Sequence, residues 1–256
     1  GQPVQRIVVF RLYLHDIAQA LGARFPRARM DMDMDDLESR TRVSVAGCLL
    51  RMVRYRYAVM TAASALQYWL LERYMQGSYQ TLYLAAPEDC AGFSTRLAPA
   101  VACRPNTVAA PRDLPALPPS NEIRLLFVGT LNYAPNEEAV RNILSDLLPE
   151  LHASGLHWHL SIVGRHASPE LQGLLKAAAQ VEFLCDVDDL GACYAAAQMV
   201  LVPLRAGGGT KLKTLEAFAH RRPVVSTQQG VRGLGTIAGV HYLPAQTAKQ
   251  FAAAII

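Results

Sequence analysis

The sequence predicts an α/β protein of two domains, each built around a parallel β-sheet. Short apolar runs alternate with longer helical patterns, as in parallel βαβ units. Five prolines between residues 104 and 120 interrupt this alternation, and proline favours an extended linker because it fixes φ and lacks an N–H donor. The 256 residues suffice for two hydrophobic cores. We therefore place the domains at residues 1–107 and 123–256, joined by a linker at 108–122.

The composition excludes several classes of protein. With 51% hydrophobic and 18% charged residues, the chain is expected to fold rather than stay disordered. A net charge of +4 is too small for nucleic-acid binding. The five cysteines are dispersed without a CxxC pair, which indicates reduced thiols. No signal peptide is visible, and the longest uncharged run, Tyr57–Leu71, is shorter than the roughly 20 residues of a spanning helix. We expect a cytoplasmic protein.

The first domain is predicted to be Rossmann-like but incomplete, because four strands are few for a doubly wound sheet. Its strand patterns lie at Ile7–Phe10, Ala28–Asp33, Thr81–Ala85 and Val101–Cys103, and its helical patterns at Asp16–Arg24, Leu37–Arg56 and Ala65–Met75.

The second domain is predicted to be a complete Rossmann-like domain of six strands, with ligands at the carboxyl ends of the strands. Its strand patterns lie at Arg124–Gly129, His157–Gly164, Val181–Leu184, Met199–Leu204, Pro223–Thr227 and Val240–Leu243. Helices are expected at Asn136–Leu151, Pro169–Ala179 and Leu190–Ala197, after the glycines 207–209, and at Phe251–Ile256. We predict Asn136 as the N-cap of the first helix and Asp188 or Asp189 as that of the third.

The segment Leu201–Arg222 combines a buried strand, three glycines and a helix that begins near Lys211. A strand that passes through a glycine loop into a helix forms an anion site, because the unpaired helix amides and the positive end of the helix dipole point at the bound group. The alternative is a tight turn with solvated basic neighbours. We predict a diphosphate site made of Arg205, Gly208, Gly209, Thr210 and Lys211.

Glu216 follows on the same helix, with Leu212, Leu215, Ala217, Phe218 and Ala219 around it. A carboxylate in such apolar surroundings needs a partner, because burying it unpaired is costly. A pair of ligand hydroxyls, as in a ribose, would serve. The alternative is an ion pair with Lys213, Arg221 or Arg222.

Other candidates lie at strand ends of the second domain. Gly129 and Thr130 end its first strand, where a glycine commonly lets a ligand or another backbone come near. Arg165 ends the next strand; the alternative is an ordinary surface arginine. His157 and His159 share a strand face, but no third ligand of suitable spacing accompanies them, so we expect no metal site.

The first domain offers two candidates. An acidic cluster runs out of its second strand and comprises Asp31, Asp33, Asp35, Asp36 and Glu38. Asp35 or Asp36 could bind Mg²⁺ or act as a base; alternatively, the outer carboxylates are solvated and cap the next helix. Residues 51–57 are basic and aromatic, so this stretch either lies on an anionic membrane or forms a solvated helix face.

Several stretches of the second domain occur in the order of a known family. They are LLFVGTLNYAPNEEAV, LSIVGR, VEFLCDVDDL, MVLVPLRAGGGTKLKTLEAFAHRRPVVST and GVRGL. Together they resemble the nucleotide-sugar domain of retaining glycosyltransferases of family 4, in the branch with a GGGTK loop. These enzymes have the GT-B fold of two Rossmann-like domains. The first domain resembles the family more loosely, through VVFRLYL, MDMDMDDLESRTR, LQYWLLERYM and RPNTV.

The resemblance implies roles for the matching residues. Glu216 would hold the ribose of the donor nucleotide, and residues about Arg165 would wall the base. The amides of Gly208–Thr210 and the side chain of Lys211 would face the diphosphate. The family needs no metal, because cationic side chains and a helix end stabilise the leaving diphosphate.

Some positions depart from the family's pattern. Many members carry two glutamates eight positions apart, and the first would fall at Gly208. An arginine and a lysine that follow the domain's first strand would fall at Thr130 and Asn136. This departure moves the neutralisation of the phosphates onto Arg205 and Lys211.

The resemblance implies a hexosyltransferase-type enzyme. It would move a sugar from a UDP- or GDP-linked donor to a glycan or lipid-linked acceptor between the domains, with retention and without a metal or other cofactor. Lys211 would act on the leaving diphosphate, while Asp35 or Asp36, in place of a histidine of many members, would orient the acceptor or the sugar. Similar proteins build cell-envelope polysaccharides, which implies a cytoplasmic location with peripheral contact at the inner face of the membrane. The alternatives are a sugar-nucleotide epimerase of the same fold and a non-catalytic nucleotide-sugar-binding subunit.

Overall fold

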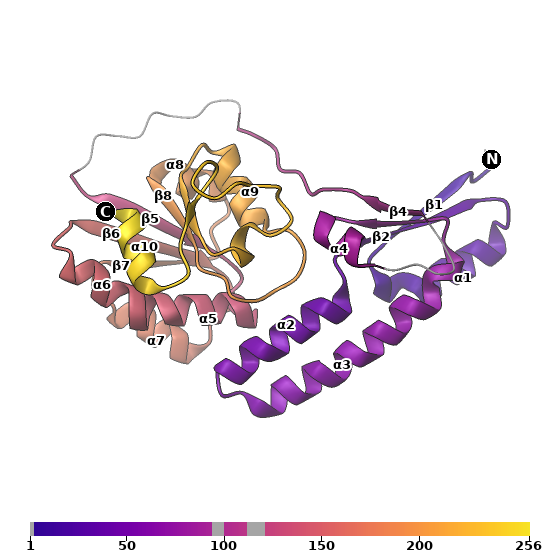
Figure 1. The fold of residues 1–256 in the computed structure, drawn as a ribbon, viewed down its shortest axis with the longest axis horizontal. Helices are drawn as coiled ribbons and strands as arrows, with labels where there is room; N and C mark the ends of the chain where they lie inside the picture. The colour runs from indigo at the N-terminus through magenta and orange to yellow at the C-terminus, as the bar shows by residue number, and fades with distance from the viewer. Residues whose placement is uncertain (1–2, 94–99, 112–120) are drawn as a thin grey trace. The chain divides into compact units, whose positions relative to one another are not determined.

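The structure, a computed structural model, describes residues 3–93, 100–111 and 121–256. Its contacts divide the chain into two compact units (Figure 1). The first comprises Gly1–Asn106 and Gly207–Thr210, and the second comprises Thr107–Ala206 and Lys211–Ile256. Most of the predicted linker, residues 112–120, lies outside the described residues.

The first unit is built on a parallel sheet, as the alternation of strand and helix patterns predicts. Within its described residues the sheet has four strands in the order β1-β2-β3-β4. These are β1 (Arg6–Phe10), β2 (Arg29–Asp35), β3 (Thr81–Leu84) and β4 (Ala100–Cys103). The helices are α1 (His15–Arg24), α2 (Glu38–Arg51), α3 (Tyr55–Tyr74) and α4 (Pro87–Gly92).

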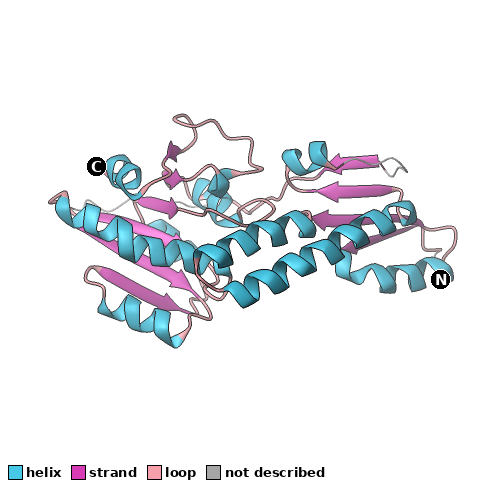
Figure 2. Ribbon diagram, turned by 60° about the horizontal axis from the view of Figure 1, so that its bottom comes forward, coloured by secondary structure: helices cyan, strands magenta, loops and turns pink. Residues whose placement is uncertain are grey.

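The helices α2 and α3 form an antiparallel hairpin (Figure 2), which differs from the two helices predicted at 37–56 and 65–75. The chain turns at Val53, whose φ is 60°, a backbone conformation that β-branched residues rarely adopt. No glycine or proline marks this turn in the sequence. The hairpin is closed by Glu72 of α3, which accepts hydrogen bonds from the amide and the hydroxyl of Ser39 at 2.9 and 2.6 Å and thereby satisfies an amide of the first turn of α2.

Strand β2 alternates methionine with aspartate and is buried on both faces. Met32 and Met34 lie in the core of the first unit. Asp31 is fully buried as well, contrary to an open acidic cluster, because Arg6 and Arg29 donate to its carboxylate at 2.6 and 3.0 Å. These hydrogen bonds hold the pKa of Asp31 below its usual value despite burial.

The second unit contains the expected six-stranded parallel sheet. Across residues 121–256 the strand order is β10-β9-β8-β5-β6-β7. The strands are β5 (Ile123–Val128), β6 (Trp158–Gly164), β7 (Val181–Cys185), β8 (Met199–Val202), β9 (Val224–Ser226) and β10 (Leu243–Pro244). The chain reverses its direction of strand addition between β5 and β8, and ligands of such sheets bind at the carboxyl ends of the strands beside this switch point.

The helices of the second unit follow the predicted order with shifted ends. They are α5 (Ala134–Asn142), α6 (Leu148–Ala153), α7 (Pro169–Ala177), α8 (Leu190–Ala196), α9 (Leu212–Ala219) and α10 (Ala248–Ile255). A π-helical turn, Ile143–Leu147, joins α5 to α6. Asp189 caps α8 through the amide of Gly191 at 2.8 Å, as predicted. The prediction of Asn136 as an N-cap is wrong: α5 begins two residues earlier, with Pro135 in its first turn, where a missing N–H costs nothing.

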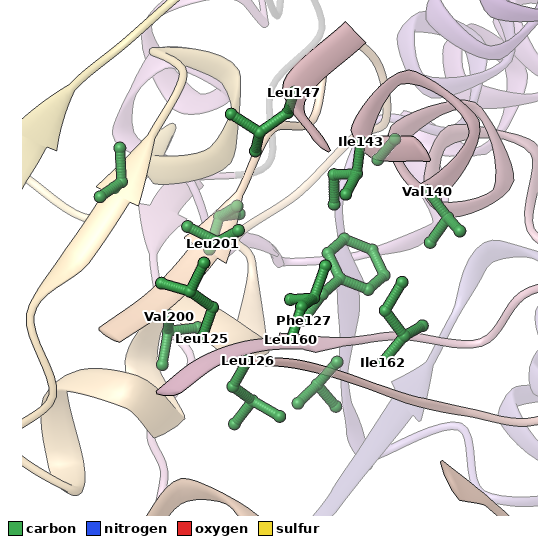
Figure 3. Packing of buried hydrophobic residues seen from close by; sticks show 14 of the residues in the cluster. Leu125, Leu126, Phe127, Val140, Ile143, Leu147, Leu160, Ile162, Val200 and Leu201 are labelled. Atoms are coloured by element: carbon green, nitrogen blue, oxygen red, sulfur yellow. The ribbon is translucent and has the colours of Figure 1, made fainter. Parts of the chain in front are cut away.

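The core of the second unit surrounds β5 (Figure 3). Leu125, Leu126 and Phe127 are buried in consecutive positions, as in a central strand with helices on both faces. Val140 and Ile143 reach this core from the helical side. No helix among the described residues is long and apolar enough to cross a bilayer.

Candidate functional site

The candidate site lies where β5 ends and α9 begins, within the second unit. Gly129 follows β5, and a Cβ atom there would lie 2.9 Å from both the ammonium of Lys213 and the amide of Asn136. Glycine at this position therefore makes room for two polar side chains. Gly164, at the end of β6, has a different role, because a Cβ atom there would overlap the carbonyl oxygen of Gly129.

Lys213 is the main residue that the sequence interpretation did not place in the site. Its Nζ atom donates to Oδ1 of Asn136 at 2.8 Å and lies 4.4 Å from the centre of the Phe127 ring. Asn136 in turn donates from Nδ2 to the carbonyl of Thr130 at 2.9 Å. Burial, and to a smaller extent the neighbouring charge of Lys211, lower the pKa of Lys213 to about 7. The sequence did carry one signal for this position: Lys213 lies four positions before the apolar Ala217, and residues with this spacing share one face of a helix.

Lys211 occupies the N-cap position of α9 and is only 8% exposed. Its carbonyl accepts hydrogen bonds from the amides of Thr214 and Leu215 at 3.0 and 3.3 Å. The amides of Leu212 and Lys213, at the start of α9, have no hydrogen-bond acceptor among the described residues. The start of α9 thus presents backbone donors and the positive end of the helix dipole beside two lysines.

Glu216 has a protein partner that the sequence interpretation missed. The hydroxyl of Tyr194 donates to its Oε2 atom at 2.7 Å. Tyr194 is fully buried and stacks on His220, with ring centres 4.9 Å apart. Burial, followed by the hydrogen bond to Glu216, raises the pKa of the Tyr194 hydroxyl, so it stays a donor. Within residues 121–256, Glu216 forms no ion pair with Lys213, Arg221 or Arg222, and its Oε1 atom accepts no hydrogen bond.

The other predicted arginines, Arg165 and Arg205, follow β6 and β8 at this same edge, and the carbonyl of Arg165 accepts a hydrogen bond from the amide of Leu131 at 2.8 Å. Arg165 lies 3.8 Å from Asp186, but both side chains are largely exposed, so their ion pair contributes little. Arg205 is exposed and lines a small cavity with Asp146 and Thr247. None of the residues around Lys213 and Glu216 lines that cavity.

The acidic residues Asp35 and Asp36 lie in the first unit and share one arginine. Arg11 contacts Asp35 at 2.7 Å and Asp36 at 2.9 Å. Asn106 donates to Asp35 at 2.8 Å, and Thr41 donates to Asp36 at 2.6 Å. Both carboxylates are therefore paired. In the part of the chain that the structure describes, no three His, Cys, Asp or Glu side chains are grouped to hold a metal ion.

The contacts group Gly208, Gly209 and Thr210 with the first unit and Lys211 with the second. Within the first unit, Thr210 accepts a hydrogen bond from Asn106 at 2.7 Å. Gly209 has a φ of 57°, which a glycine adopts without strain.

Comparison with known proteins gives a family and a fold. Residues 122–256 match the family described as "Glycosyl transferases group 1". No curated protein matches the sequence.

Three solved structures illustrate the likeness in fold. The first is an α,α-trehalose-phosphate synthase (UDP-forming) from Burkholderia xenovorans, with 12% identity, a TM-score of 0.66, and coverage of 100% of this chain and 66% of that one. The second, described as trehalose-6-phosphate from E. coli bound with UDP-2-fluoro glucose, has 14% identity, a TM-score of 0.67, and coverage of 100% and 65%. The third is HepE from Anabaena in complex with UDP and glucose, with 14% identity, a TM-score of 0.65, and coverage of 97% and 67%.

The chain thus spans about two thirds of the length of these structures. At such low identity the likeness shows the fold alone. It confirms the predicted α/β class with two parallel sheets.

Proposed function

The chain belongs to the group 1 glycosyl transferases, and from this premise we propose that it transfers a sugar from a nucleoside diphosphate sugar to an acceptor. The observation that supports this proposal most directly is that the first turn of α9 meets the end of β5 at the edge of the second-unit sheet, where Lys213 contacts Asn136 beside Gly129. Two of the similar structures hold UDP or a UDP-sugar, which supports a nucleotide donor for this chain as well.

We assign the donor diphosphate to the start of α9. The side chain of Lys211 and the amides of Leu212 and Lys213 supply one cation and two donors, and a helix N-terminus favours negative charge. The loop Gly208–Thr210, which leads into α9, is also part of this proposal. Thr130 and Gly129 border the site at the end of β5, and Arg165 and Arg205 remain proposed outer contacts.

We assign the donor ribose to Glu216. Tyr194 holds one oxygen of this carboxylate, while the other accepts no hydrogen bond within residues 121–256. A ribose hydroxyl is a donor that this oxygen can accept, and the fixed orientation lowers the entropic cost of binding. The structure thus favours the ligand interpretation of Glu216 over the ion-pair interpretation.

Transfer is proposed to follow the retaining course of family 4, with a hexose as the transferred sugar and without a metal cofactor. Lys211 and the start of α9 would stabilise the charge that develops on the leaving diphosphate, as fixed cations and dipoles do in other transfer reactions. Asp35 and Asp36 are held by Arg11. We therefore propose that they orient hydroxyl groups of the sugar or of a glycan or lipid-linked acceptor.

The donor assignment can be tested by calorimetric titration of the chain with UDP, GDP and their sugars. Glu216→Ala and Lys211→Ala are each expected to weaken binding at least tenfold, whereas Lys176→Ala, an exposed lysine on α7, leaves it unchanged. Equal affinities in all four proteins would refute the assignment. Product analysis then separates the alternatives: transfer supports the enzyme, epimerised donor supports the epimerase, and binding without turnover supports a binding subunit.

A membrane-facing role of the first unit is supported by the outer face of α3. Val59, Leu66 and Leu70 are 68%, 60% and 55% exposed and share one face by helical spacing. Arg56 and Arg73 continue this stripe at its two ends. The sequence carries no acidic residue between positions 38 and 72. An apolar stripe with only basic charges suits the surface of an anionic bilayer, so we propose peripheral membrane contact through α3.

Vesicle sedimentation tests this contact. The chain is expected to pellet with phosphatidylglycerol vesicles but not with phosphatidylcholine vesicles. Leu66→Glu should abolish pelleting, while Leu174→Glu, at an exposed leucine of α7, should not. Pelleting that is insensitive to Leu66→Glu would refute the role of α3.

A further inference from the structure

Lys213 is a partly buried cation that forms no ion pair among the described residues. Among the described residues, no carboxylate oxygen lies within ion-pair distance of its Nζ atom, whose contacts are the neutral Oδ1 of Asn136 and the ring of Phe127. An ammonium has three donors, and one is used in a hydrogen bond here. Removing an ammonium from water without a charged partner is costly, so a lysine at this position suggests that a ligand supplies the missing partner.

The surroundings hold the ammonium in a defined place. The Nδ2 atom of Asn136 donates to the carbonyl of Thr130, which fixes the amide so that its oxygen points at Lys213. Gly129 leaves the space beside Nζ open, since a side chain there would collide with it at 2.9 Å. Three elements, β5, α5 and α9, therefore cooperate to position one positive charge at the carboxyl edge of the sheet.

The charged groups near Lys213 do not neutralise it. Glu216 raises its pKa, but the effects of burial and of Lys211 are larger and of opposite sign. The side chains that contact it from α5 and β5, Asn136 and Phe127, are neutral. The charge is thus only partly compensated within the unit, and a bound anion would compensate the rest.

We propose that Lys213, positioned by Asn136 at the open end of β5, contacts the diphosphate of the bound nucleotide as the second cation of the site. This inference rests on the proposed donor site and adds a residue to it. Lys213 supplies, from α9, positive charge at the edge of the sheet where Thr130 and Asn136 are uncharged. Because it touches the phosphate rather than the transferred sugar, its contribution is to the binding and departure of the diphosphate.

Nucleotide binding should also change the protonation of Lys213. Since burial brings the pKa of Lys213 to about 7 in the free chain, its side chain is mostly a neutral amine at pH 8. A phosphate beside it raises that pKa again. Nucleotide binding at pH 8 should therefore take up a proton. The affinity for the nucleotide falls as the pH rises above 7, because protonating Lys213 then uses an increasing part of the binding free energy.

Calorimetry with UDP at pH 8, in buffers of different ionisation enthalpy, measures this uptake directly. The unmodified chain should take up close to one proton per UDP. Lys213→Met should weaken UDP binding at least tenfold and abolish the uptake, while the control Lys176→Met should match the unmodified chain. Circular dichroism checks that each variant is folded.

The outcomes separate the two proposals. UDP binding without proton uptake in the unmodified chain would overturn the role of Lys213 even if the variant failed to fold. Unchanged affinity and uptake in Lys213→Met would also overturn it, and both results would leave the donor site at Lys211 and Glu216 intact. Failure of the unmodified chain to bind UDP, GDP or their sugars would overturn the proposed function together with this inference.

Discussion

Replacing Lys213 by methionine is expected to flatten the pH dependence of the stability of the second unit. In the folded chain burial lowers the pKa of this lysine to about 7 from its ordinary value of 10.5. Between these two values the unfolded chain binds more protons than the folded one, so the stability of the unmodified unit rises with pH. The contribution is fully present above the ordinary pKa and is lost as the pH falls through 7.

The size of the effect on the stability of the second unit follows from the shift in the pKa of Lys213. Each pH unit within the window contributes up to about 1.4 kcal/mol, and the folded lysine is half protonated at pH 7. From pH 7 to pH 9 the unmodified unit should therefore gain about 2 kcal/mol more stability than Lys213→Met. The loss of the hydrogen bond to Asn136 lowers the stability of the variant by a similar amount at both pH values, so it cancels in this comparison.

Urea unfolding followed by tryptophan fluorescence provides the assay. Trp158 is buried in the second unit, and Trp69 is a half-exposed residue of the first. A Trp69→Phe background isolates the signal of Trp158, and Lys176→Met in this background is the matched control. Parallel pH dependences for the unmodified chain and Lys213→Met would show that this ammonium is not desolvated, and the reasoning would then fail.

Three further predictions concern packing. Glu72→Ala leaves a first-turn amide of α2 without its acceptor and should destabilise the first unit by about 2 kcal/mol in urea unfolding; because burial raises the pKa of this carboxyl, the difference should grow as the pH falls towards that pKa. Tyr194→Phe removes the donor to Glu216 and should cost about 2 kcal/mol in thermal unfolding; no change would mean that water replaces the hydroxyl. Gly164→Ala places a Cβ atom against a main-chain carbonyl and should cost about 3 kcal/mol. In contrast, Gly173→Ala, inside α7 with open space around it, should stabilise the unit by about 0.5–1 kcal/mol, because alanine favours a helix more than glycine does.

The sheets could be predicted because their strands carry a local signal. Strand β5 is a run of apolar residues next to a glycine, and such a run belongs to the middle of a parallel sheet. The passage from β8 through the glycine loop into α9 could be predicted for the same reason, since a strand, three glycines and a helix are adjacent in the sequence. In these cases the residues that determine the structure are close neighbours.

The features that could not be predicted depend on residues that are distant from one another in the sequence. The turn at Val53 has no local breaker, and only the packing of α3 on α2 imposes its left-handed backbone. Tyr194 and Glu216 are 22 positions apart, so nothing local indicates that they share a hydrogen bond. Lys213 and Asn136 are 77 positions apart, so nothing local indicates that the Asn136 amide accepts a hydrogen bond from this lysine rather than capping the helix, which begins two residues earlier.

The parallel pairing of every strand in the second-unit sheet, across residues 121–256, bears on how this unit folds. At the centre of the sheet Leu125 pairs with Met199, so the β6 and β7 segments must be looped out before β5 and β8 can meet. Closing a long loop costs chain entropy before any contact repays it. We expect the α2–α3 hairpin, whose helices are adjacent in sequence, to form early, and the docking of β8 on β5 to limit the rate. The edge of the sheet that we propose as the donor site would then be among the last parts of the unit to assemble, since it requires both strands in place.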